Sequence, residues 1–172
     1  FIFLISFLKI SYTDEILIES EELIITNEPL TTTFIGNVYA FDNEIKLWSD
    51  KILILYTETE SQIDQIKCFG NSKLVKENQE IISENITYFV IDKKIYAKGD
   101  IILTQDENVM KGNELSVDLV KSTSIMKSSQ NNKVKVKINN NELFVMFQLM
   151  LNVAKRLVFL GKMVQVKQQH FI

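Results

Sequence analysis

The feature that most constrains the fold of this chain is a repeat in its middle. Three segments align without gaps: GNVYAFDNEIKLWSDKILILY from Gly36, GNSKLVKENQEIISENITYFV from Gly70, and GDIILTQDENVMKGNELSVDL from Gly99. A fourth half-unit, SEELII from Ser20, matches the middle of each segment. Self-similarity at this spacing indicates one supersecondary unit that is used several times.

Each unit reads as a strand, a turn and a second strand. Two runs with alternating apolar residues flank the polar stretches FDNE, VKENQE and TQDEN, which is the pattern of a hairpin. The Gly-Asn or Gly-Asp pair that opens each unit suits a turn or a bulge, where glycine tolerates positive φ. No part of the repeat has a sustained helical period, so the sequence predicts an all-β, antiparallel fold.

One strand parity stays apolar in every copy of the repeat. Because side chains alternate across a strand, this parity should form a single interior face. The opposite parity contains Lys51, Asn85 and Glu114 and should meet solvent. One apolar face and one solvent-exposed face predict an antiparallel sandwich, barrel or jelly roll. Apart from Ser72, the interior positions are Val38, Ala40, Leu47, Ile52, Ile54, Tyr56, Leu74, Ile81, Ile86, Tyr88, Val90, Ile101, Leu103, Met110, Leu115, Val117 and Leu119.

Composition argues against several classes of function. The chain has 172 residues, enough for one domain, and a net charge of −3. Residues 132–172 carry seven Lys or Arg against one Glu, which leaves −9 on residues 1–131 and disfavours nucleic acid as a partner. Cys68 and His170 are the single cysteine and histidine, so we expect no disulfide, no metal site, no cofactor and no catalytic residues.

The first residues resemble part of an export signal. FIFLISFL is a short apolar run of the kind found in the core of a signal peptide, and it lacks the preceding basic segment. We therefore interpret residues 1–13 as a signal-peptide remnant and expect an exported protein, with the folded domain over residues 14–131.

Three stretches resemble the recurring units of the OstA-like family of lipopolysaccharide transport proteins. They are TTTFIGNVYAF with LWSDKILILY, IKCFGNSKLV, and IYAKGDIILTQDENVMKGNELSVDL, and the similarity covers about residues 14–128. The resemblance implies a twisted β-jelly roll in the periplasm whose interior shields the acyl chains of lipid A. It also implies inner-membrane LptC-like and outer-membrane LptD-like partners, and head-to-tail assembly of like domains.

Two alternatives stay open at this point. The chain could be an LptC-like component or the N-terminal domain of the outer-membrane translocon, which share the fold. It could also be a structural β-repeat that binds proteins and has a packed interior. Trp48 falls on the outer parity, where we expect it to pack under a loop. Asp50 and Glu84 should be solvated residues at the starts of strands.

The last part of the chain does not continue the repeat. Residues 132–172 turn basic and then apolar and end in GKMVQVKQQHFI. Read out of frame with permitted wobble bases, residues 145–172 can encode a strand followed by G-x-x-x-x-G-K-T, the phosphate-binding loop of an ATPase. We therefore expect 132–172 to be an out-of-frame reading of a neighbouring transporter ATPase gene and to form an unsupported tail that binds no nucleotide.

Overall fold

The computed structural model describes residues 17–41, 45–58, 62–129 and 131–139, and all of its regular structure there is β-strand. No helix that could span a membrane occurs in these ranges. The strands are β1 (Leu17–Glu19), β2 (Glu22–Asn27), β3 (Leu30–Phe41), β4 (Ile45–Tyr56), β5 (Ile63–Lys76), β6 (Gln79–Phe89), β7 (Lys94–Gln105), β8 (Asn108–Asp118), β9 (Thr123–Lys127) and β10 (Lys135–Lys137).

The ten strands form one antiparallel sheet in which chain neighbours are mostly sheet neighbours. The order is β1-β3-β4-β5-β6-β7-β8-β10, with β2 also paired to β3 and β9 also paired to β8. Within the described residues the first and last strands do not pair, so the sheet stays open. The all-β antiparallel prediction is confirmed.

The three predicted units are hairpins, but their strands begin earlier than the repeat does. β3, β5 and β7 start at Leu30, Ile63 and Lys94, several residues before the glycine that opens each unit. The glycines therefore lie in the middle of strands. The repeat becomes recognisable at the glycine because the positive φ there favours that residue type.

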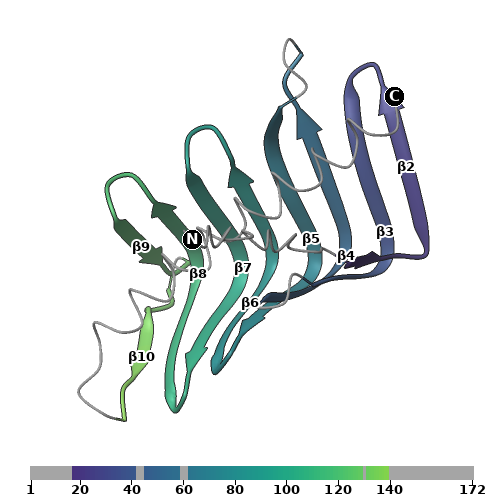
Figure 1. Ribbon diagram of the computed structural model, residues 1–172. Coiled ribbons are helices and arrows are strands. Elements are labelled where there is room, and N and C mark those ends of the chain that lie inside the picture. The colour runs from purple at the N-terminus through teal and green to yellow at the C-terminus, as the bar shows by residue number, and fades with distance from the viewer. Residues whose placement is uncertain (1–16, 42–44, 59–61, 130, 140–172) are drawn as a thin grey trace, which may run out of the picture.

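A bulge in each of these strands bends the sheet. Between Ile35 and Val38 the β3–β4 register shifts, so that Gly36 and Asn37 together face Asp50. The same shift recurs at Gly70 in β5 and at Gly99 in β7, where φ is again positive. An extra residue on one strand bends it. Because the bulges are aligned, the sheet folds into a trough with two walls (Figure 1).

In the even-numbered strands the alternation of buried and exposed residues shifts by one residue at this corner. In β4 the buried residues are Ile45, Leu47 and Ser49 before the corner, but Ile52 and Ile54 after it. The corner thus keeps one side of the sheet apolar on both walls. Asp50 and Glu84 lie in the middle of β4 and β6, at the corner, so the prediction that they start strands was wrong.

The strands at both ends of the sheet are split at the corner. β1 pairs with the second half of β3 and β2 with the first half. At the other end β9 and β10 divide β8 in the same way. β10 falls inside the segment predicted to be an unsupported tail, and its three residues pair with Val109, Met110 and Lys111 instead. Residues 1–16 and 140–172 lie outside the described residues, with most of the signal-peptide and tail predictions.

Candidate lipid-binding face

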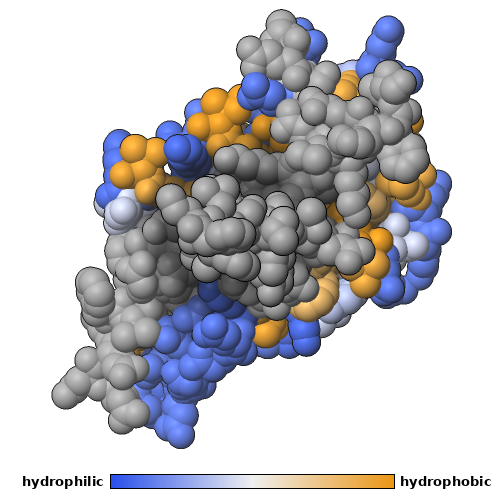
Figure 2. Space-filling model, viewed as in Figure 1, coloured by the Kyte–Doolittle hydropathy of each residue, from blue (hydrophilic) through white to orange (hydrophobic). Residues whose placement is uncertain are grey.

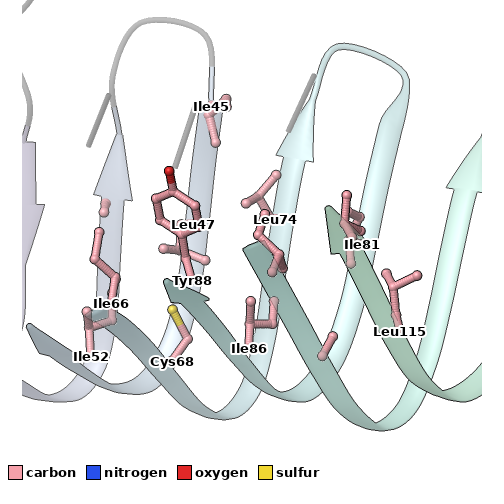
Figure 3. Packing of buried hydrophobic residues seen from close by; sticks show 14 of the residues in the cluster. Ile45, Leu47, Ile52, Ile66, Cys68, Leu74, Ile81, Ile86, Tyr88 and Leu115 are labelled. Atoms are coloured by element: carbon pink, nitrogen blue, oxygen red, sulfur yellow. The ribbon is translucent and has the colours of Figure 1, made fainter. Parts of the chain in front are cut away.

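The concave side of the folded sheet, called the inner face below, carries all of the predicted interior residues. Fourteen of the seventeen are buried, and Leu103 and Val38 are 0% exposed. The other three, Val90, Met110 and Leu119, are partly buried and pack against the same cluster. Figure 3 shows several of the buried ones, among them Leu74, Ile86 and Tyr88, directed into the space between the walls. The parity argument therefore located the inner face.

Six further apolar residues on the inner face were not predicted. Five of them precede the glycines and so lie outside the aligned units, whereas Ile45 lies inside the first unit and is aligned with Gln79 and Asn108. The same alternation continues upstream of each glycine, and that signal could have found most of them. They are Ile45, Ile63, Ile66, Cys68, Ile95 and Ala97, each at most 6% exposed.

The apolar residues form continuous rows across the strands. In one wall Ile54 pairs with Ile66, and the row continues through Tyr88 and Ile95 to Val117. In the other wall the row is Leu47, Leu74, Ile81, Leu103 and Met110. Neighbouring strands lie about 4.8 Å apart, so each row repeats an apolar side chain at that interval along the trough.

The serine hydroxyls of the inner face that lie at the corner are hydrogen-bonded there. Ser49 Oγ donates to the carbonyl oxygen of Phe69 at 3.0 Å and lies 3.2 Å from Ser72 Oγ. Ser83 Oγ likewise donates to the carbonyl oxygen of Lys98 at 3.1 Å. These hydroxyls satisfy carbonyl groups that the bulges release from the strand ladder. The floor of the trough is thus polar but satisfied.

Two titratable side chains of the inner face are affected by burial. Burial raises the pKa of the Cys68 thiol from 9.0 to about 12. It also raises the pKa of the Tyr88 phenol from 10.0 to about 12. In both cases the cause is the loss of water around the charged form. Both groups are therefore neutral at physiological pH, and the thiol is a poor nucleophile.

The outer face has a different character. Trp48 packs between strands against Tyr39, with ring centroids 5.3 Å apart, and the Lys73 ammonium lies 5.9 Å from its ring. It contacts neighbouring strands, not a loop, which corrects the prediction. Elsewhere on this face Phe89 and Tyr96 meet edge to face and line a shallow hollow of about 450 Å³.

Groups that could hold a metal ion are absent from the part of the chain that the structure describes. Its inner face offers aliphatic side chains, one thiol, hydroxyls and few amides. Such a surface can hide hydrocarbon from water.

An open, folded antiparallel sheet with a continuous apolar inner face is suited to a protein that carries an apolar cargo. Residues 17–123 match the family model described as LptA/(LptD N-terminal domain) LPS transport protein. The chain therefore belongs to this family of lipopolysaccharide transport proteins.

Two individual proteins place the chain in context. It is 36% identical over 105 residues to the uncharacterized protein RP507 of Rickettsia prowazekii (strain Madrid E), which covers 57% of this chain and 70% of that protein. The fold is similar to the crystal structure of LptH, the LptA homologous periplasmic component of the lipopolysaccharide transport device from Pseudomonas aeruginosa. That likeness has a TM-score of 0.60 and 11% identity, and covers 74% of this chain and 96% of LptH.

Proposed function

We propose that the inner face binds the acyl chains of lipopolysaccharide and that the chain works in the periplasm as an LptA-type bridge between the two membranes. The observation that carries this proposal is the continuity of the apolar rows across β4 to β8. A core needs only enough apolar area to hold a fold together. Rows of similar side chains along the whole length also give a moving hydrocarbon chain equivalent places to rest.

The energetic need for such a face is large. Each CH₂ group removed from water gains about 0.8 kcal/mol, so an acyl chain of about a dozen carbons is disfavoured in water by roughly 10 kcal/mol. Successive sites of similar affinity let lipid advance without a deep trap. Repetition of the same residue types in each hairpin provides that uniformity.

The inner face is buried in the structure, so lipid has to replace the side-chain contacts that cover it. An open sheet permits this, because within the described residues no strand pairing closes the trough. The aliphatic lining exchanges side-chain contacts for equally apolar lipid contacts. The net change in apolar area exposed to water is then small.

Site-specific crosslinking tests the proposal. A photo-crosslinking amino acid at Ile54 or at Leu103, on opposite walls of the inner face, should capture lipopolysaccharide in living cells. The same group at Lys51 or Glu114 should not, because both side chains lie on the outer face. Equal capture at all four positions, or capture at none of them, would rule out the proposed function as a lipopolysaccharide carrier.

The ends of the sheet support a way to extend the trough. All six residues of β2 are exposed, and Leu23, Ile24 and Ile25 are 53%, 41% and 56% exposed. Figure 2 shows apolar patches among hydrophilic surface both where β2 lies and near the turn between β8 and β9. Within the described residues β2 has a partner on one edge only, as β9 does. Such edges pair readily with a further strand.

We propose that β9 of one copy pairs with β2 of the next, head to tail. Because all neighbours from β2 to β9 are antiparallel, these two strands run in opposite directions and would continue the alternation. When the corners are aligned, Lys127 faces Glu22 on the outer face. Ile125 then faces Ile24. A charge pair and an aliphatic pair both favour this register.

LptC-like and LptD-like domains are the partners that the same edges would serve in the cell, since they would present compatible strand edges. A packed interior that serves only as a scaffold for protein binding is the second candidate, because Val38 and Leu103 are completely buried. The crosslinking experiment separates the two functions. A scaffold would give no lipid adduct from either wall.

A further inference from the structure

One hydroxyl on the inner face lacks a partner. Tyr88 is 1% exposed, and its Oη makes no hydrogen bond within the part of the chain that is described. Figure 3 shows the ring rising from β6 into the space between the walls, with the hydroxyl at its tip. Burying a hydroxyl without a hydrogen bond is unfavourable, so its retention among aliphatic residues calls for an explanation.

Two other hydroxyls on the same face have hydrogen-bond partners. Tyr56 Oη lies 3.3 Å from Thr32 Oγ1, and Ser49 binds the backbone at the corner. A phenylalanine in place of Tyr88 would fill the same space without the unpaired group. The hydroxyl is therefore not needed for packing.

A second unpaired hydroxyl lies on the same register row. From Tyr88 the row passes through Ile95 and Val117 to Ser124. The Oγ of Ser124 is inaccessible to solvent and also lacks a partner. The two residues are three strands apart, which corresponds to about 14 Å along the trough. Both hydroxyls thus lie along the direction in which a lipid would travel.

We infer that Tyr88 Oη donates a hydrogen bond to a carbonyl or hydroxyl oxygen of a bound acyl chain, and that Ser124 offers the next such position. This inference rests on the proposed function. A plain alkyl chain would leave both hydroxyls unsatisfied, whereas the oxygen that joins an acyl chain to its headgroup would satisfy one of them. The row thereby distinguishes acyl lipids from pure hydrocarbon.

The neutral state of Tyr88 agrees with the role of a donor. Burial holds the pKa of its phenol at about 12, so the proton is present at any pH the cell meets. A phenolate could accept a hydrogen bond but not donate one to a carbonyl oxygen.

The test compares two lipids that differ only in that oxygen. Phosphatidylglycerol with two ester-linked tetradecanoyl chains and its ditetradecyl ether analogue are titrated against the full chain, with displacement of a bound fluorescent fatty acid as the readout. The wild type should bind the ester lipid about fivefold more tightly, since the ether oxygens are poorer acceptors than ester carbonyl groups. Tyr88→Phe should lose most of this preference, and Tyr88→Phe combined with Ser124→Ala should bind both lipids equally.

Tyr96→Phe is the matched control, because it removes the same hydroxyl from the outer face of the adjacent strand. It should keep the ester preference. Urea unfolding of lipid-free Tyr88→Phe should show a stability equal to or above that of the wild type, since no hydrogen bond is lost. An undiminished ester preference in Tyr88→Phe would overturn the inference alone. Failure of both lipids to bind the wild type would overturn the proposed function as well.

Discussion

The carboxylate of Asp50 in β4 covers the α-carbon of Gly70 in β5 at the corner of the trough. Asn71 Nδ2 donates to Asp50 Oδ2 at 3.0 Å and holds the carboxylate there. A β-carbon on Gly70 would collide with this carboxylate, and the φ of +70° is itself unfavourable for other residues. Gly99 and Glu84 repeat the arrangement between β7 and β6. The Gly-Asn pair of the repeat is thus one side of a contact between two strands, and the acidic residue of the preceding strand is the other side.

Gly70→Ala should therefore destabilise the fold for two separable reasons. The strained φ costs about 1–2 kcal/mol, and displacement of the carboxylate adds to this. Urea unfolding measures the loss. In an Asp50→Ala background the same substitution should cost less, because only the backbone term remains. Equal costs in both backgrounds would contradict the contact between carboxylate and glycine.

Charge reversal at the sheet edges should change self-association. Lys127→Glu or Glu22→Lys alone should weaken association about three- to tenfold at low salt, because a like-charge pair replaces an attraction. The double variant should restore it. Sedimentation velocity over a range of protein concentrations gives the dissociation constant.

Lys98→Glu makes the same change in net charge away from both edges, on the outer face of β7, and is the control. It should leave association unchanged. If all three single variants associate like the wild type, the β9–β2 register is wrong.

Alkaline pH should weaken the fold through the two buried groups. Their folded pKa values are raised, so the folded state keeps protons that the unfolded state releases above pH 9 for Cys68 and above pH 10 for Tyr88. Their contribution to stability is complete below pH 9 and is lost as pH rises toward 12. The slope per group approaches about 1.4 kcal/mol per pH unit.

Urea unfolding at pH 8, 9.5 and 10.5 measures this dependence. Cys68→Ala removes one of the two groups and should show a shallower fall between pH 9.5 and 10.5, whatever its stability at pH 8. Identical slopes for the variant and the wild type would show that the thiol stays protonated in both states or is hydrated in the folded state.

The sequence predicted the hairpins and the inner face because each depends on a pattern with a local cause. Alternation alone placed Ile54, Tyr88 and Leu103 on one side. β10, inside the predicted tail, pairs along β8 through backbone groups that any residue possesses. Side-chain pattern carries no information about such an edge.

The corner could not be predicted because it arises between strands. Asp50 and Glu84 look like turn residues when each strand is considered alone. Their position depends on the glycine of the next strand, which lies 20 residues after Asp50 and 15 after Glu84 in the chain. Ser49 and Ser72 look like exceptions to an apolar pattern for the same reason. The register that brings them together exists only in the folded sheet.

The corner has a consequence for how such proteins can grow. Each bend needs one extra residue in the first strand of a hairpin. It also needs a one-residue shift of the buried positions in the second strand, so a single hairpin encodes both. Duplicating a hairpin gene segment would therefore add a further slice with the same cross-section. The length of the trough can evolve independently of its cross-section, so related proteins could span different distances by repeating the same hairpin.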